Sequence, residues 1–263
     1  MDAATYLERI GYNGPLDVSL GTLRALHRAH LMTVPFENLD IHLGRLIVLE
    51  HTALFDKIVR RRRGGFCYEL NGMFAWLLGQ LGFEVTMLQA GVAREGGGFG
   101  PDFDHMTLLV RLDREWLADV GFGESFLEPL QIGEHSESLQ HRFVYLVTGD
   151  GHHLFLQRRQ SRTLGSADSD NPWKPQYRFD LRPREFGDYN EMCVYHQTSP
   201  KSTFTQRRVC TRATAEGRVT LTGSHLIVTS GPEKDDRAVT SNAEYTQLLR
   251  KHFGIELPCE LVG

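Results

Sequence analysis

Cys67 has the sequence surroundings of a nucleophilic thiol. It follows Gly64-Gly65 in the run RGGFCYELN and stands at the start of a segment whose pattern predicts a helix. The positive end of a helix dipole lowers the pKa of a thiol and makes it more nucleophilic. A buried cysteine that serves only as a small apolar side chain is the commoner alternative. The cysteines at positions 193, 210 and 259 lack this setting, and for them the apolar role is preferred.

His105 and Asp119 are the candidates for the base and the orienting group that a catalytic cysteine needs. Most of the twelve histidines lie in polar stretches, which predicts a surface position for them. His105 instead opens an alternating strand, after the glycine-rich loop REGGGFGPDFD. Asp119 ends the next strand among apolar residues, where a carboxylate is costly unless it is paired. Together these positions predict that the carboxylate of Asp119 accepts a hydrogen bond from the imidazole of His105. The alternative is a structural carboxylate that is hydrogen-bonded to backbone amides.

The hairpin between these two strands must satisfy a geometric condition. A two-residue turn at Asp113-Arg114 would place His105 and Asp119 on opposite faces of the hairpin. A catalytic triad therefore requires a bulge or a loop of odd length here, and we predict one.

Other clusters give weaker signals. His152-His153 would point to opposite faces of a strand, so no metal site is assigned. The glycines at 96–98 could cradle a phosphate, but a flexible hairpin loop is preferred. The run Arg60 to Arg62 is typical of a solvated helix end, whereas Arg63 adjoins the cysteine motif.

The elements that must position these residues change character along the chain. Helical periodicity predicts helices at 4–10, from Leu20 to before Pro35, at 51–62 and from Cys67 to Gly82. Period-two alternation predicts strands at 83–94, 105–112, 114–120, 142–148, 152–159, 204–214, 217–223 and 225–230, with a loop at 161–176. A last helix is predicted at 242–253, with a capping box from Ser241 to Glu244. Segregated helices and strands indicate an α+β fold.

Composition excludes several classes of protein. The 263 residues are 41% hydrophobic and 24% charged, as in globular proteins. A formal net charge of -4 gives no general reason to bind nucleic acid. No apolar run approaches the ~18 residues of a membrane helix, and the first residues lack the apolar core of a secretory signal. Four cysteines without paired spacing fit a reducing, cytoplasmic compartment.

The segment Arg63–Asn71 resembles the active-site motif of the arylamine N-acetyltransferase family. Three further segments also look like family motifs: VPFENL at 34–39, DVGFG at 119–123 and SPKSTF at 199–204. They resemble its N-terminal signature, its aspartate motif and the segment that enters its third domain. The four occur in the family's order and cover most of the chain.

The resemblance implies a fold and an activity. The fold would comprise a helical bundle at 1–82, a central antiparallel β-barrel at 83–190 and an α/β lid at 191–263, around a cysteine-protease-like Cys-His-Asp core. The activity would be acetyl-coenzyme A-dependent N-acetylation of arylamines, arylhydrazines and N-hydroxyarylamines. It would follow a ping-pong mechanism through an acetyl-cysteine, without a metal. The chain lacks room for the long inter-domain insertion of vertebrate members, which implies a bacterial form.

The resemblance also implies roles for particular residues. The triad would be Cys67, His105 and Asp119. The acceptor pocket would be lined by Phe36, Phe122 and Phe204; Gly121 and Gly123 would lie against the pantetheine arm, and Arg63 and Glu37 would form an ion pair. The partners would be small aromatic amines or hydrazines and coenzyme A, with neither nucleic acid nor membrane, and a homodimer stays open.

One residue departs from the family pattern, and two other functions remain open. Asp104 stands directly before His105, where relatives often carry a small hydroxyl residue, and an extra acid there could repel the coenzyme's phosphates. The same three catalytic residue types occur in thiol amidases, transglutaminase-like enzymes and cysteine proteases. A coenzyme A or aromatic-ligand binding module with a vestigial triad is the second alternative.

Overall fold

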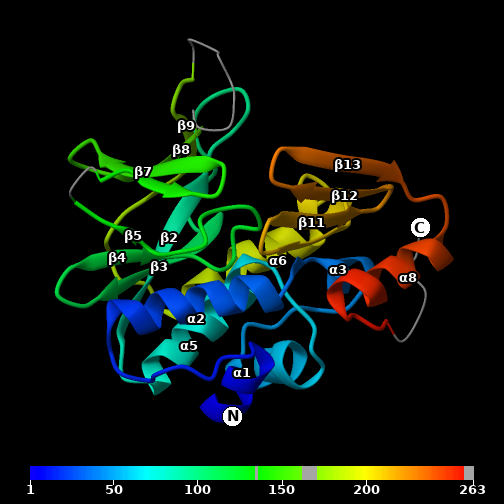
Figure 1. Cartoon of the computed structure of the whole chain (residues 1–263), viewed down its shortest axis with the longest axis horizontal. Helices are drawn as coiled ribbons and strands as arrows, with labels where there is room; N and C mark the ends of the chain where they lie inside the picture. The colour runs from blue at the N-terminus through cyan, green and yellow to red at the C-terminus, as the bar shows by residue number, and fades with distance from the viewer. Residues whose placement is uncertain (134–135, 162–170, 258–263) are drawn as a thin grey trace.

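The computed structural model describes residues 1–133, 136–161 and 171–257 (Figure 1). The N-terminal helices are α1 (Ala3–Arg9), α2 (Leu20–Thr33), α3 (Leu39–His42), α4 (His51–Phe55), the π-helical turn η1 (Asp56–Arg60) and α5 (Cys67–Gln80). Ser19 caps α2 by accepting a hydrogen bond from the amide of Thr22. The helix expected at 51–62 ends earlier, because its last turn widens at η1 and buries Lys57 beside Ile58 and Val59.

A large antiparallel sheet follows the helices. Within the described residues it has eight strands, in the order β5-β4-β3-β2-β9-β8-β7-β6. The strands are β2 (Glu84–Val92), β3 (His105–Arg111), β4 (Glu115–Ala118), β5 (Leu130–Gln131), β6 (Ser138–Gln140), β7 (Phe143–Gly149), β8 (Leu154–Gln160) and β9 (Lys174–Phe179). The sheet curls into a barrel whose two ends are joined by a side chain: Gln140 accepts from the amides of Leu127 and Glu128. Helix α5 packs on β2 and β3, and Figure 1 shows α2 and α5 beneath this sheet.

Strand β9 corrects the loop predicted at 161–176, of which residues 162–170 lie outside the described ranges. The composition of this stretch hid the strand, because Pro175 cannot donate to a ladder. The ladder accommodates the proline with an irregularity: the register between β8 and β9 shifts between Leu156 and Gln157. The fully buried Tyr177 then completes the core of the barrel.

A smaller antiparallel sheet joins the two ends of the chain. In the part that the structure describes it contains β1 (Phe36–Glu37), β10 (Val209–Ala213), β11 (Gly217–Thr222), β12 (His225–Ser230) and β13 (Glu233–Ala238), paired in that order. Helix α8 (Asn242–Phe253) lies against β10 and β11, and its apolar stripe packs into their core. Its predicted bounds are confirmed, since Ser241 caps its first turn and Gly254 adopts the left-handed conformation at its end. Strand β13 was not predicted, because it is a charged, exposed edge strand.

Between the two sheets run η3 (Phe186–Tyr189), α6 (Asn190–Thr198) and α7 (Thr203–Gln206), none of which was predicted. The strand expected at 204–214 is wrong in its first part, because α7 occupies it and β10 begins only at Val209. The segregation of helices and antiparallel strands confirms the α+β prediction. Over the described ranges, no helix combines the length and the hydropathy needed to cross a bilayer.

Candidate active site

Cys67 is the first residue of α5, and its side chain is 3% exposed. The loop before it is held tightly against the start of the smaller sheet. The amide of Glu37 donates to the carbonyl of Gly65 at 2.9 Å. A Cβ atom on Gly64 would overlap the carbonyl oxygen of Pro35, so glycine is required for this close approach.

His105 and Asp119 lie on the same face of the β3–β4 hairpin. Arg111 pairs with Glu115, so the connecting loop has three residues, 112–114, and the predicted loop of odd length is confirmed. The resulting register brings Nε2 of His105 to 2.7 Å from Oδ2 of Asp119, with both side chains buried. This contact leaves Nδ1 as the imidazole nitrogen that is free to exchange a proton with a neighbouring group.

Asp119 is surrounded by hydrogen-bond donors. Its Oδ1 accepts from Asn71 Nδ2 and from the amide of Gly121, each at 2.9 Å. Burial alone would raise the pKa of Asp119, but His105, Asn71 and the Gly121 amide outweigh it and hold that pKa below its usual value. The carboxylate therefore stays ionised and can stabilise an imidazolium beside it.

Asn71 joins the cysteine helix to the strands that carry the other two residues. It lies one turn after Cys67 on α5, and its Nδ2 also donates to the carbonyl of Met106 at 2.6 Å. Its Oδ1 accepts from the amide of Val120 at 2.9 Å. Sequence reasoning assigned Asn71 no role, although its four-residue spacing from Cys67 predicts a shared helix face.

His27 supports the aspartate from the opposite side. Its Nε2 accepts from the amide of Asp119 at 3.0 Å and its Nδ1 contacts the carbonyl of Leu127 at 2.8 Å, so the proton sits on Nδ1. Burial lowers the pKa of His27 to about 4, which keeps the ring neutral. The expectation that most histidines other than His105 lie at the surface is wrong for His27, His30 and His196, which are buried.

The thiol of Cys67 is harder to ionise than its helix position predicts. Burial raises its pKa, and the charges of Asp104 and Asp119 add to this effect. The backbone amide of Met106 donates to the sulfur and acts in the opposite direction. The expectation of a pKa lowered by the helix terminus alone is therefore wrong, because it took no account of two nearby carboxylates. A thiolate here needs a proton acceptor beside it.

The three predicted pocket phenylalanines are all half-buried near the triad. The ring of Phe36 lies 6.1 Å from that of Phe204, which in turn packs edge-on against Phe66 at 5.6 Å. The ring of Phe122 is T-shaped to His105 at 5.2 Å. Aromatic walls of this kind suit a planar apolar ligand.

Two glycines bring the β4 end close to the cysteine. A Cβ atom on Gly121 would lie 2.9 Å from Cα of Cys67, nearer than packed side chains approach. Gly123 has φ +87°, and a Cβ atom there would contact Phe36 at 3.8 Å. Gly121 therefore lets the end of β4 pack directly on the backbone of Cys67, and Gly123 lets the following turn approach Phe36.

Behind Cys67 lies a buried cluster of five charged residues, which we call the ion cluster: Glu37, Asp40, Lys57, Arg63 and Glu69. The guanidinium of Arg63 bonds Glu37 at 2.8 Å and Asp40 at 3.1 Å, which confirms the predicted ion pair with Glu37. The ammonium of Lys57 bonds Asp40 at 2.8 Å and Glu69 at 2.7 Å. Buried charges of this kind are tolerated because each has an opposite partner.

Glu69 connects the ion cluster to the cysteine helix. Its Oε2 accepts from the amide of Phe66 at 3.0 Å, which satisfies a donor that the helix itself leaves unpaired. Three carboxylates meet two cations, so full ionisation would leave one excess negative charge. Burial, opposed by Lys57, raises the pKa of Glu69 to about 7.

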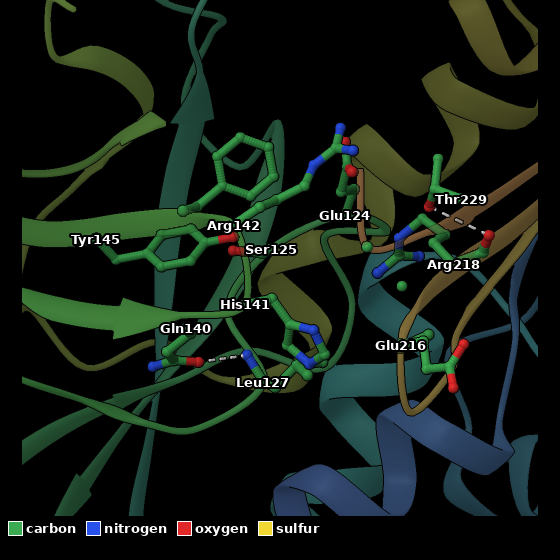
Figure 2. Close-up of a pocket in the computed structure, with 14 residues that line it drawn as sticks. Glu124, Ser125, Leu127, Gln140, His141, Arg142, Tyr145, Glu216, Arg218 and Thr229 are labelled. Atoms are coloured by element: carbon green, nitrogen blue, oxygen red, sulfur yellow. Dashed lines mark hydrogen bonds between the residues drawn. The ribbon is translucent and has the colours of Figure 1, made fainter. Parts of the chain in front are cut away.

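A cavity of about 250 Å³ opens between the barrel and the smaller sheet, next to Gly123 (Figure 2). Its wall begins at Glu124 and Ser125 and includes Arg142, Tyr145 and Arg218. Arg218 donates to Thr211 at 3.0 Å, and burial lowers its pKa, so an anion beside it would be favoured. Ser125 Oγ is buried without a hydrogen-bond partner among the described residues. No local sequence pattern indicates this cavity, because its wall comes from four separate stretches of chain.

The structure thus places the His105–Asp119 pair at the start of α5, where Asn71 bonds Asp119 and the amide of Met106, the neighbour of His105, reaches the sulfur of Cys67. The predicted aromatic and glycine residues lie around them. No group of three or more histidine, cysteine, aspartate or glutamate side chains within the described ranges could hold a metal ion.

Comparison with families and curated proteins gives one consistent result. The N-acetyltransferase family model matches residues 19–262. Arylamine N-acetyltransferase 2 of Mus musculus is 33% identical over 281 residues, covering 100% of this chain and 97% of the relative. Arylamine N-acetyltransferase 1 of Homo sapiens is 33% identical over 280 residues, again covering 100% and 97%.

Solved structures agree with the sequence comparison. The arylamine N-acetyltransferase of M. smegmatis superposes with a TM-score of 0.87 at 33% identity, covering 97% of this chain and 93% of that one. The Mycobacterium marinum arylamine N-acetyltransferase in complex with CoA gives a TM-score of 0.86 at 29% identity, with coverage of 97% and 93%. The α+β architecture with a cysteine-protease-like core is therefore shared with these proteins.

Proposed function

This chain belongs to the arylamine N-acetyltransferase family, and from that membership we propose that it transfers the acetyl group of acetyl-coenzyme A to arylamines, arylhydrazines and N-hydroxyarylamines. The observation that carries the proposal is the 2.7 Å contact between His105 and Asp119, which Asn71 ties to the helix of Cys67. A nucleophile, a base and an orienting acid are the three parts that acyl transfer through a covalent intermediate needs.

In the first half-reaction, Nδ1 of His105 takes the proton of the Cys67 thiol. Because burial and two carboxylates raise the pKa of this thiol, the thiolate forms only together with the imidazolium. The sulfur attacks the thioester carbonyl carbon, the bond to the coenzyme's sulfur breaks, and coenzyme A leaves with the proton from His105. Exchange of one thioester for another is nearly balanced in energy, so acetyl-Cys67 is accessible.

In the second half-reaction, the acceptor nitrogen attacks the acetyl carbon and His105 takes its proton as general base. The thiolate of Cys67 is the leaving group and the N-acetyl product departs. Phe36, Phe122 and Phe204 would hold the acceptor ring by apolar contact. A neutral aniline or hydrazide nitrogen is unprotonated near neutral pH and can attack directly.

The acyl donor would approach along the backbone of Gly121 and Gly123, which would lie against the pantetheine arm. The cavity beside Gly123 (Figure 2) would receive a more distant part of coenzyme A, with Arg218 and Arg142 available to its phosphates. The structure of the Mycobacterium marinum neighbour is a complex with CoA, which supports coenzyme A as the donor here.

We also propose the division of the chain into units at 1–82, 83–190 and 191–263. Three hydrophobic clusters support it: one joins the helices to one face of β3 and β4, one fills the barrel, and one lies under the smaller sheet. The free thiols of Cys67, Cys193 and Cys210 support action in the cytoplasm, where cysteines stay reduced.

The deciding experiment is intact-protein mass spectrometry after brief mixing with acetyl-coenzyme A and no amine. We expect a gain of one acetyl group, absent in Cys67→Ala, retained in the matched control Cys193→Ala, and discharged by an aromatic amine or hydrazine. Acetate released without an amine would favour a hydrolase. An unchanged mass with intact acetyl-coenzyme A would overturn the proposal and favour a binding module.

A further inference from the structure

Asp104, the residue that departs from the family pattern, has a partner that the sequence did not indicate. Its Oδ1 lies 3.4 Å from Nε2 of His196 on α6, and its backbone carbonyl oxygen lies 3.3 Å from the same nitrogen. Its Oδ2 accepts from the amide of Val92 at 3.2 Å. Both oxygens that face Nε2 are acceptors, so this nitrogen carries a proton.

His196 also touches the acceptor side of the site. Its Nδ1 lies 3.3 Å from Oγ of Ser202, and that oxygen accepts from the amide of Phe204. Its ring packs edge-on against Phe204 at 5.2 Å and lies 6.1 Å from the ring of Tyr68, the neighbour of Cys67. With only 7% of the residue exposed, His196 is held in one position by these contacts.

The site therefore contains two aspartate–histidine pairs. In the first, Asp119 holds the base His105. In the second, Asp104 would set its negative charge near the thiol of Cys67, where a negative charge opposes ionisation of sulfur. The Nε2–H of His196 would offset part of that charge, because it faces both the carboxylate and the carbonyl oxygen of Asp104.

We propose that His196 is a positioning residue: its Nε2–H donates to Asp104 and offsets part of the negative charge beside Cys67, while its ring and its contact with Ser202 hold Phe204 in place. The inference rests on the proposed function, because it assigns a role within the same site. The other titratable groups that face Cys67 and His196 are His105 and Asp119 from the β3–β4 hairpin, Tyr68 from α5, Tyr189 from η3, and Cys193 and Tyr195 from α6.

The test measures the rate of alkylation of Cys67 by iodoacetamide against pH, resolved by peptide mass spectrometry. It compares the wild type with Asp104→Asn, His196→Gln and the double variant. We expect the profile of His196→Gln to lie about one pH unit higher than that of the wild type. At a pH below both midpoints, this corresponds to a tenfold lower rate of alkylation. The profile of Asp104→Asn should lie at lower pH than that of the wild type. The double variant should lie near Asp104→Asn, because without the Asp104 carboxylate His196 has no negative charge to offset.

His196→Phe serves as a second variant, since a phenyl ring keeps the packing against Phe204 and Tyr68 if glutamine disturbs the fold. The matched control is the exposed pair on the smaller sheet, in which Nδ1 of His225 lies 2.9 Å from Oδ1 of Asp236. His225→Gln should leave the profile unchanged. The inference is overturned if His196→Gln and His196→Phe both reproduce the wild-type profile, or if the effect of His196→Gln is the same with and without Asp104.

Steady-state kinetics provide the second readout. We expect His196→Gln to raise KM for the arylamine several-fold more than KM for acetyl-coenzyme A, because Phe204 loses its support. Equal changes in both KM values would contradict the positioning role. Alkylation does not require acetyl transfer, so a failure of Cys67 to accept an acetyl group would sink the proposed function while leaving this test readable.

Discussion

The two sides of the N-terminus of α5 are both buried and polar, yet they are built from different groups. Behind Cys67, the ion cluster matches carboxylates to cations at 2.7 to 3.1 Å. In front of it, Asp119 is met by the neutral donors of Asn71 and Gly121 and by the imidazole of His105.

From this difference we expect the ion cluster to hold the loop before Cys67 and the groups around Asp119 to support proton transfer. In the ion cluster each ionised group depends on an opposite charge, so the loss of one partner leaves another charge buried and unpaired. Around Asp119, the neutral donors keep their protons, and His105 alone can exchange one readily. The ion cluster should therefore govern stability, and the front side should govern turnover.

The largest expected effect comes from Asp119→Asn. The amide cannot stabilise an imidazolium, and it favours the wrong tautomer of His105, so kcat should fall by roughly 10⁴-fold. The free energy of unfolding should change far less, because an amide fills the same space. Steady-state acetylation and denaturant unfolding measure the two quantities. Asp113→Asn, exposed in the hairpin loop, is the control, and a loss of kcat smaller than tenfold would contradict the assignment.

On the opposite side, Lys57→Met should mainly destabilise the fold. It removes the cation from Asp40 and Glu69 and should lower the free energy of unfolding by about 3–5 kcal/mol. The rate at which the folded fraction forms acetyl-Cys67 should stay within tenfold of wild type. Urea unfolding and mass spectrometry check both points, with the exposed Lys251→Met as control. A stability loss under about 1 kcal/mol would mean that the ion cluster does not hold the loop.

On the Asp119 side of Cys67, His27 should make the free energy of unfolding depend on pH. Its pKa is about 4 in the folded protein and 6.5 in the ordinary case, so the unfolded chain takes up a proton that the folded protein refuses. Its contribution to stability is therefore lost as pH falls from 6.5 to 4, by about 3 kcal/mol. His27→Gln should lose less stability over that window than wild type. His30 also titrates in this range, but it is present in both the wild type and His27→Gln. Parallel curves of unfolding free energy against pH for these two proteins would refute the prediction.

Glu69 should give the ion cluster a weaker dependence of opposite sign. Its pKa is raised from 4.5 to about 7, so the folded protein keeps a proton that the unfolded chain has released. Its contribution is full below pH 4.5 and is lost as pH rises to 7. The change is at most about 3 kcal/mol. In Glu69→Gln, the free energy of unfolding should no longer show this loss between pH 4.5 and 7. A change of the same sign as that for His27→Gln would contradict the difference between the two sides of Cys67.

Much of the fold was predictable where local chemistry decides the outcome. Ser241 and Gly254 define α8 because a cap and a left-handed glycine act within one turn. The odd-length loop was predictable from parity alone, once His105 and Asp119 were required to meet. Strand β13 was not, because its charged residues Glu233 to Arg237 carry no alternation, and only the neighbouring strand β12 makes them a strand.

The site divides in the same way. Cys67, His105 and Asp119 could be found because each stands in a distinctive local motif. Asn71 and His27 could not, since their partner Asp119 lies 48 and 92 residues away and only the fold brings them together. The raised pKa of Cys67 was missed for the same reason, because it depends on burial and on the spatial positions of Asp104 and Asp119.

The two-residue strand β1 has a consequence for the order in which the molecule is assembled. Phe36 and Glu37 pair with Thr211 and Cys210, while the same short strand holds Gly65 in the loop before the nucleophile. Contacts between residues so distant in sequence form late, because a long loop must close first. A ribosome-bound chain that ends before residue 209 would lack strand β10, the partner of β1. The loop before Cys67 should therefore reach its native position only near the end of synthesis.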